Sequence, residues 1–434
     1  MFALLRQPNF ARLWVGQLIS MLGDWVLFIA LPFYVYELTG SALTTGLMFM
    51  IGLLPGLLFG SVAGVFVDRW DRRRLMIAAD LLRAVTLLAL LWVRSVEWLW
   101  LVYAVALVQA VVSQFFFPAK SAIIPRLVGQ QDLMAANSLN GLSDSLTRLI
   151  GPTIGGVLMA MFGLTSVVLV DSASFLFSAL MIYWIADTRT ASLSEVEGAN
   201  LASSEPVSRA GGPAHLLSDW LEGLRLIKSQ RLLSALLSIS SVIAFADGIF
   251  TALIVVFVKE VVHAGTIELG WMMAAQGVGG LLGGLTMGFI RRQFQPSRVV
   301  IASCFADGAL LLAIFNAGQL GLILALFVIA GVMIIALNVS SQTLLQEATA
   351  DQFRGRVFGA LSTVGALARL GGLILAGALA DLVGPLPILD VGGLLWLVAG
   401  VMAVWLLPAP ALQAVANNTA ELGIPEPSGQ AVGV

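Results

Sequence analysis

Charged residues are scarce in this chain, where Asp, Glu, Lys and Arg make up only 11% of 434 residues. Soluble domains contain about 25% charged residues, because a water-soluble protein of any size keeps a large polar surface. Hydrophobic residues reach 59%, so a soluble enzyme, a disordered scaffold and a collagen-like fibre are all excluded. The composition therefore indicates an all-α polytopic protein whose first partner is the lipid bilayer.

Residues that hold metals, disulfides or nucleotides are equally scarce. Cys304 is the single cysteine, and His215 and His263 are the two histidines, so we expect no disulfide and no metal site. No segment matches the phosphate-binding loop of ATPases, and we expect no cofactor. No Ser/His pair or His/Glu cluster occurs at membrane depth, which predicts no catalytic residues and no enzyme activity. The net charge of −2, without a basic stripe, argues against nucleic acid as a partner.

Long apolar runs are abundant instead. A bilayer core needs about 20 mostly apolar residues per helix, and the sequence contains twelve such runs. They cover residues 10–36, 44–67, 75–93, 98–117, 133–161, 165–186, 232–258, 269–290, 298–315, 320–343, 357–382 and 387–407. The connections are short except for 187–230, which is polar. The sequence therefore predicts twelve transmembrane helices.

The two groups of six helices resemble each other. Residues 46–66 and 270–290 share seven identities at an offset of 224, and 145–163 and 366–384 share seven at an offset of 221. Arg148 matches Arg369 in the second comparison, and Asp24 falls near Asp247 at an offset of 223. Chance matching in a Gly- and Leu-rich chain is the alternative. We predict two pseudo-symmetric six-helix bundles, as in transporters that rock around a site at mid-membrane.

These repeats set the predicted domain boundaries. They are an N-terminal bundle at 1–186, a cytoplasmic linker at 187–230, a C-terminal bundle at 231–410 and a disordered tail at 411–434. In the linker, an amphipathic pattern predicts a helix on the membrane surface. Its apolar face consists of Leu216, Leu217, Trp220, Leu221, Leu224 and Ile227.

The distribution of Lys and Arg predicts the orientation. If the N-terminus is cytoplasmic, inside segments hold 18 of the 23 basic residues, and outside loops hold only Arg94 and Lys259. Basic residues are retained on the cytoplasmic side. We therefore expect a multi-pass protein of the plasma membrane, the inner membrane of a bacterium, with both termini cytoplasmic, and we expect a monomer.

The strongest local motif lies in the short loop after the second run, at residues 64–74. It resembles the signature G-x-x-x-D-R-x-G-R-[RK] of the major facilitator superfamily, which implies the fold of that superfamily. The matching residues are Gly64, Asp68, Arg69, Arg72 and Arg73. Asp71 stands where the family usually has glycine. We interpret the motif as a gating latch in which Asp68 pairs with a basic group or a helix N-terminus of the other half. The alternative is that the basic residues only fix topology.

A second motif, G-P-T-I-G-G at residues 151–156, resembles the antiporter motif of exporters in the superfamily. Its characteristic residues are Gly151, Pro152, Gly155 and Gly156. Proline bends a helix, and glycines permit close contact with a helix of the other half. The resemblance implies a seal against leakage, whereas ordinary small-residue packing is the alternative.

A narrower resemblance runs from the N-terminus to about residue 405. Residues 117–128 and 135–139 look like the drug/proton antiporter branch that contains macrolide efflux proteins and the enterobactin exporter. The resemblance implies export of drugs, macrolides or siderophore-like compounds. The fourth run lacks the arginine that many drug/proton antiporters carry there, and has Gln109 and Gln114 instead. Proton coupling must then depend on other charged groups.

Charged side chains inside a bilayer are costly and usually face a cavity. Asp24 and Asp247 lie midway along the first and seventh runs, and Arg148 and Arg369 midway along the fifth and eleventh. In the superfamily fold these helices line or flank the cavity. We therefore expect protons or substrate cations to bind the aspartates, with the arginines as partners. Static ion pairing is the alternative.

Other charges inside the runs have more local interpretations. Asp144 is a further candidate for proton coupling, and the alternative is that it simply pairs with Arg148, four residues later in the same helix. Asp171, in the sixth run, is a shallower candidate for proton transfer. Asp80 with Arg83, and Asp307, lie on the third and ninth runs, where we expect structural pairing or snorkelling.

Aromatic and amide side chains are expected to line the substrate cavity. The candidates are Trp25, Phe28, Gln109, Gln114, Phe245, Phe250, Asn338 and Gln342. Aromatics with few polar groups suit an amphipathic small molecule. The sequence therefore predicts a secondary active transporter that exports such compounds in exchange for protons by alternating access. The alternatives are a metabolite or lysolipid transporter or flippase, and a non-transporting sensor or scaffold of the same fold.

Overall fold

The computed structural model describes residues 2–186, 213–350 and 353–407, apart from the side chains at 2–3, 59–66, 68–69, 130, 213–219 and 291. Every regular element in these ranges is a helix. The elements are η1 (Phe2–Arg6), α1 (Pro8–Thr39), α2 (Ala42–Arg69), α3 (Arg72–Leu88), η2 (Ala89–Trp92), η3 (Val96–Trp98), α4 (Leu99–Leu127), η4 (Gln130–Asp132), α5 (Leu133–Tyr183), α7 (Pro213–Ser229), α8 (Arg231–Val256), the π-helical η6 (Phe257–Val261), α9 (Thr266–Gln293), α10 (Pro296–Phe315), α11 (Leu320–Ala348), α12 (Arg354–Val383) and α13 (Pro385–Leu406).

Ten helical segments of the described chain are long and apolar enough to cross a membrane. One of them, α5, is 51 residues long and holds two crossings, because its backbone breaks at Gly163, where φ is 70°. Glycine adopts this angle without the steric cost that a side chain would bring. Together with α2, which is 28 residues long, these segments confirm the prediction of twelve spans. The fourth span is longer than predicted, because α4 continues through Pro118 to Leu127.

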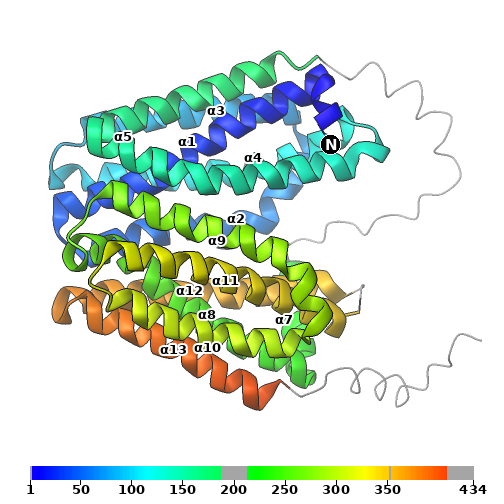
Figure 1. The fold of residues 1–434 in the computed structure, drawn as a ribbon. Coiled ribbons are helices and arrows are strands. Elements are labelled where there is room, and N and C mark those ends of the chain that lie inside the picture. The colour runs from blue at the N-terminus through cyan, green and yellow to red at the C-terminus, as the bar shows by residue number, and fades with distance from the viewer. Residues whose placement is uncertain (1, 187–212, 351–352, 408–434) are drawn as a thin grey trace, which may run out of the picture.

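The spans form two bundles (Figure 1), one from α1 to α5 and one from α8 to α13, with α2 and α9 between them. In the first bundle α1 packs on α5, α2 on α4, and α3 on α5. The second bundle repeats these pairings, with α8 on α12, α9 on α11, and α10 on α13. The helix pairings therefore follow the sequence repeat.

The bundles meet where α5 packs on α9 and where α2 packs on α12 and α8. Polar contacts between them gather at one end, which we call the closed end. There the Tyr36 hydroxyl donates to Glu260 at 2.7 Å, and Lys259 pairs with Glu37 at 3.1 Å. Beneath them, Phe33 of α1 belongs to one apolar cluster with buried residues of α8. The opposite end, where α1 begins and α13 ends, is called the terminal end below.

Asp381, at the end of α12, caps the start of α2 across the closed end. Its carboxylate accepts from the Ser41 hydroxyl at 2.6 Å and from the Ala42 amide at 2.7 Å. Free amides and a positive dipole at a helix N-terminus favour a carboxylate in this place. Asp381 corresponds in the repeat to Ala160, which has no carboxylate. The first half therefore cannot make the equivalent cap.

The helix α7 packs against the second bundle. Its residues Trp220, Leu224 and Ile227 form a cluster with Val357 and Ala360 of α12. The prediction placed this apolar face on the membrane surface, whereas the described part of α7 uses it to cover α12. Leu216 and Leu217 lie outside the described side chains. The remainder of the linker, at 187–212, and the tail predicted at 411–434 lie outside the described residues.

Candidate functional site

A cavity of about 1060 Å³ lies between the two bundles. Its walls come from α1, α2 and α5 on one side and from α8, α9, α11, α12 and α13 on the other. It extends from mid-depth toward the terminal end, since Asp144, Ser240 and Ser341 belong to its lining. The cavity is therefore closed off from one end by the contacts between the bundles.

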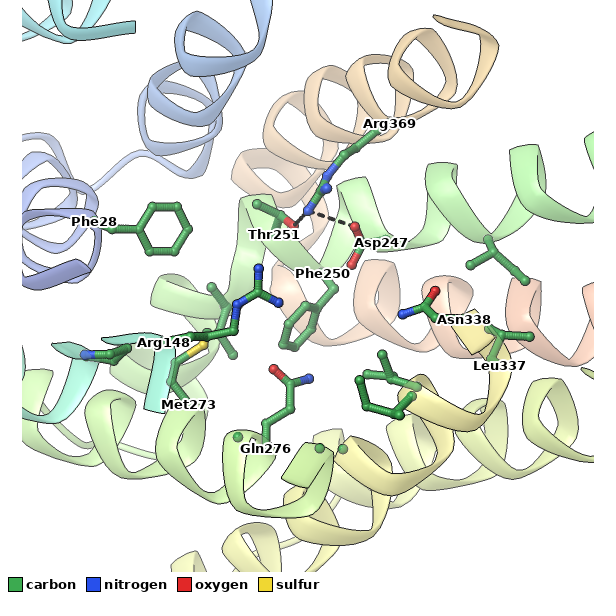
Figure 2. A pocket seen from close by; sticks show the side chains of 18 of the residues that line it. Phe28, Arg148, Asp247, Phe250, Thr251, Met273, Gln276, Leu337, Asn338 and Arg369 are labelled. Carbon is green, nitrogen blue, oxygen red and sulfur yellow. Dashed lines mark hydrogen bonds and ion pairs between the residues drawn. The ribbon is translucent and has the colours of Figure 1, made fainter. Parts of the chain in front are cut away.

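Asp247 and Arg369 form an ion pair in the cavity wall, with 2.7 Å between Oδ2 and Nη2. Their side chains are 40% and 38% exposed, so both face the cavity. Arg369 also donates to the Thr251 hydroxyl at 3.1 Å (Figure 2). Because α8 and α12 pack together along their length, the pair is held between two neighbouring helices. The structure therefore contains the pair that the sequence suggested for these two residues.

Arg148 behaves differently, although it is the repeat counterpart of Arg369. Its guanidinium carbon lies 5.3 Å from the ring centre of Trp25, a cation–π contact, and its side chain points into the cavity (Figure 2). No carboxylate of the described residues lies within ion-pair distance of Arg148. The pairs predicted with Asp24 and with Asp144 are therefore not formed, and Asp144 instead lines the cavity as an exposed side chain.

Other lining residues combine aromatic rings with amides. Trp25, Phe28, Phe250 and Asn338 belong to the lining, as the sequence predicted. Gln276 of α9 also points into the cavity (Figure 2), and the sequence analysis missed it. Its signal was an amide in the middle of an apolar span, where a polar group usually faces a cavity.

Four predicted lining residues are absent from the cavity lining, and three of them make other contacts in the described structure. Gln109 donates to the Arg83 carbonyl at 2.9 Å, inside the first bundle. Gln114 donates to the Ala110 carbonyl of its own helix at 3.5 Å. Phe245 packs against Gly371 of α12. Gln342 follows the lining residue Ser341 but is not itself part of the lining. A single-span pattern does not show which face of a helix turns toward the other bundle.

Asp24 also lies away from this cavity. It faces the interior of the first bundle, where it interacts electrostatically with Arg83, Asp171 and Asp80. Asp80 and Asp171 are fully buried, and Arg83 is 3% exposed. The structure therefore places Asp24 and Asp171 together, and it separates Asp24 from the arginine predicted as its partner.

The predicted latch is described only in part. The side chains of Gly64, Asp68 and Arg69 lie outside the described set, so the latch stays a prediction. Arg72 donates to the Ala122 carbonyl at 3.0 Å, and Arg73 donates to the Ile182 carbonyl at 3.1 Å. Both contacts stay within the first bundle.

The residue that departs from the latch signature has a local role. Asp71 caps α3 by accepting from the Arg74 amide at 3.0 Å. Carboxylates are strongly preferred at a helix N-cap because they satisfy a free amide of the first turn.

The antiporter-like motif faces two helices. Gly151 and Gly155 lie against Trp25 and Val26 of α1, in the same bundle. Gly156 lies against the backbone of Thr266 in α9, and the Thr266 hydroxyl donates to its carbonyl at 2.9 Å. On the partner helix, a side-chain carbon at Gly270 would come within 2.7 Å of the Pro152 carbonyl oxygen. Glycine at these positions lets α5 and α9 touch by their backbones.

Sequence comparisons cover most or nearly all of the chain. A family model described as transmembrane secretion effector matches residues 1–431. The multidrug efflux pump Tap of Mycolicibacterium fortuitum is 30% identical over 399 residues, 88% of this chain and 92% of that protein. The MFS-type transporter YfiS of Bacillus subtilis is 28% identical over 389 residues, 87% and 88% of the two chains. Macrolide efflux protein A of Streptococcus pyogenes is 25% identical over 383 residues, 87% and 90%.

Solved structures show the same fold. The nucleoside transporter NupG superposes with a TM-score of 0.72 at 13% identity, covering 92% of this chain and all of that one. A bacterial homologue of the iron transporter ferroportin superposes with a TM-score of 0.70 at 15% identity, covering 91% and 98%. At these identities the likeness concerns the fold alone.

Proposed function

The chain belongs to the transmembrane secretion effector family of the major facilitator superfamily, and on this premise we propose that it exports amphipathic organic compounds in exchange for protons. It is a multi-pass membrane transporter whose relatives include a macrolide efflux protein and a multidrug efflux pump. The substrate class, the direction and the coupling ion are the proposal. It rests on the cavity between the bundles and on the ion pair in its wall.

The chemistry of the cavity supports the substrate class. Aromatic rings of Trp25, Phe28 and Phe250 offer apolar and π surfaces, while Asn338 and Gln276 offer a few hydrogen bonds. Pockets of this kind take ligands with an apolar body and a small polar part. Arg148 is available to an anionic group and Asp144 to a cationic one, because neither is paired with a described residue. A volume of about 1060 Å³ accommodates compounds larger than a sugar or an amino acid.

The arrangement of the contacts supports alternating access. The polar contacts described at the closed end are one ion pair, one hydrogen bond and a helix cap, which are individually weak interactions. Opening there also exposes the apolar cluster around Phe33, a cost that contacts formed when the cavity shuts at the terminal end would offset. If both termini are cytoplasmic, the present state opens the cavity to the cytoplasm, where a substrate for export enters.

The ion pair in the wall supports proton coupling. Protonation of Asp247 would neutralise its charge and release Arg369, which is held by only one other described partner, Thr251. If the protonated pair is more stable in one of the two conformations of the transporter, protonation shifts the equilibrium toward that conformation. An inward proton gradient would then drive the cycle in the direction of export.

Reconstituted vesicles test this proposal directly. Proteoliposomes carrying the full chain are given a pH gradient and offered a lipophilic cation, a macrolide or a siderophore as the probe. We expect gradient-dependent accumulation of at least one amphipathic probe, abolished by a protonophore and absent from protein-free liposomes. The Phe28→Ala variant should raise the half-saturating probe concentration, whereas Leu394→Ala, at an exposed position of the lipid-facing type on α13, should not.

The other outcomes identify the rival functions. Movement of a fluorescent lysolipid that ignores the pH gradient would indicate a flippase. A folded protein that moves no probe in either direction would contradict transport and would favour a sensor or scaffold.

A further inference from the structure

The first bundle contains a group of charges that the cavity does not reach. Asp24 of α1, Asp80 and Arg83 of α3, and Asp171 of the second half of α5 interact there. The Asp80 and Asp171 side chains are fully buried, and that of Arg83 is almost so. We call these four residues the inner cluster. It lies behind the cavity wall, since none of the four belongs to the cavity lining.

Several polar atoms of the inner cluster lack partners in the described structure. Both carboxylate oxygens of Asp80 are buried without a hydrogen bond of ordinary geometry, although the Ser178 side chain interacts with this carboxylate. Oδ2 of Asp171 and Nε of Arg83 are buried without a partner. Asp80 lies 4.0 Å from Arg83, beyond hydrogen-bonding distance. A buried polar atom without a partner is costly and needs an explanation. A proton on each of two carboxyl groups would remove the charge that makes burial without a partner most costly.

The charge balance of the inner cluster also indicates two bound protons. Three carboxylates face one guanidinium, and Arg83 is also stabilised by the rings of Phe175 and Phe116, at 4.9 and 5.2 Å. Ser174 donates to Asp171 at 3.2 Å, and Ser113 accepts from Arg83. The neighbouring α4 contributes only uncharged groups at this level. Its nearest cation, Lys120, contacts Met21, three residues before Asp24. Neutrality therefore requires two additional positive charges.

Protons fit this requirement better than a metal ion. In the described chain, no group of three or more His, Cys, Asp or Glu side chains has the spacing to hold a metal ion. The carboxylates of the inner cluster thus interact at a distance without converging on one point, and a guanidinium sits among them. Metal coordination needs oxygens that converge on the ion.

We propose that the inner cluster is a second proton-binding site, separate from the Asp247–Arg369 pair. The inner cluster takes up two protons and thereby sets the position of α1. This inference deepens the proposed function and rests on it for its role in transport. The helix α1 connects the two sites, because Asp24 faces the cluster while Trp25 faces the cavity beneath Arg148. Loss of a proton places like charges on α1 and α5, which repel each other and displace Trp25.

Infrared pH-difference spectra of the purified full-length protein test the proposal. A protonated carboxyl group has its own C=O stretching band, which is separate from carboxylate bands. We expect this band in the wild type and a loss of about half of its cluster component in Asp24→Asn and in Asp171→Asn, because each removes one of the coupled acids. Asp390→Asn serves as the control, because Asp390 is a partly exposed carboxylate outside the inner cluster that accepts from Asn316.

Asn resembles the protonated carboxyl group in shape and charge, so both variants should fold, and size-exclusion profiles check this. If Asp24→Asn does not fold, Asp171→Asn carries the test. An unchanged band in a folded variant would overturn the proposal. So would a titration that sodium ions reproduce in place of protons, because the cluster would then be a sodium site.

The spectrum does not depend on transport, so the two failures are distinguishable. A band that the variants remove, in a protein that moves no probe, would retain the proton site and reject the exporter. Gradient-driven flux in a protein whose band the variants leave unchanged would retain the exporter and reject this site.

Discussion

The two halves of the molecule carry the same charged positions but use them differently. In the second half, Asp247 pairs with Arg369 across α8 and α12, in view of the cavity. In the first half, Asp24 turns away from Arg148 and faces Asp80, Arg83 and Asp171, while Arg148 lies over Trp25. The second half has no equivalent buried set among its described residues, because Asp307 of α10 is buried there without an arginine beside it.

This difference shows that duplication preserves where charges lie along a helix but not which partner each finds. Arg83 is the residue that separates the halves, since its guanidinium attracts Asp24 into the first bundle. Without a counterpart of Arg83, Asp247 remains with the arginine of the neighbouring helix. The proton site proposed for the first half therefore lies out of reach of the cavity, whereas the one proposed for the second half lies in the cavity wall.

The largest expected effect comes from removing the one cation of the inner cluster. Arg83→Leu leaves buried carboxylates without compensation, and we expect a loss of about 3–5 kcal/mol of folding free energy. Arg148→Leu is the matched control, because its side chain is exposed to the cavity and unpaired with described residues. Thermal unfolding in detergent compares the two variants. Equal losses of stability would contradict a buried inner cluster that is distinct from the cavity wall.

The next effect concerns coupling through the cavity pair. Asp247→Asn fixes this position in its neutral form, so we expect gradient-driven flux to fall at least tenfold, which corresponds to about 1.4 kcal/mol. Downhill exchange of the same probe without a gradient should persist. A variant that retains full gradient-driven flux would remove Asp247 from the mechanism.

The reactivity of introduced cysteines with a maleimide distinguishes the cavity from the inside of the first bundle, and this test needs no substrate. Cys304 is fully buried, so the wild type should react slowly with a bulky, water-soluble maleimide. Asn338→Cys, in the cavity, should react quickly when the reagent is added on the side of the termini. Ser178→Cys, fully buried beside Gln17 in the first bundle, should stay unlabelled. Rapid labelling of both would mean that water reaches the inner cluster directly.

The smallest effect concerns the cap at the closed end. Asp381→Asn weakens three bonds to the start of α2, and we expect a shift of about 1 kcal/mol toward the state that is open at this end. Distances between spin labels across the closed end measure this shift. Asp390→Asn, on α13 near the same end, provides the control. An unchanged distance distribution would mean that the cap does not help to hold the end shut.

Apolar run lengths predicted the twelve spans, because a bilayer imposes one length on every crossing. The break at Gly163 and the extension of α4 past Pro118 changed only the boundaries. The face of α7 was predicted correctly as apolar but assigned to lipid, because a hydrophobic face looks the same whether lipid or α12 covers it.

The site was less predictable, for a physical reason. Mid-span Asp and Arg residues were identified correctly as intramembrane charges, but their partners depend on helix rotation and on neighbours far apart in the sequence. Asp24 could pair with Arg148 or with Arg83, and only the packing of α1 and α3 on α5 decides between them. Gln109 was assigned to the cavity because the sequence does not show the rotation of its helix. In the structure it donates a hydrogen bond inside the first bundle instead.

Exchange of substrate for protons is the central claim. The most direct measurement imposes a gradient of the probe and follows the movement of protons. Proteoliposomes containing a trapped pH-sensitive dye are given a gradient of a transported probe and no pH gradient. We expect that probe moving down its gradient drives protons the opposite way, and that Asp247→Asn abolishes this proton movement. Probe movement without any opposing change in internal pH would contradict exchange of substrate for protons.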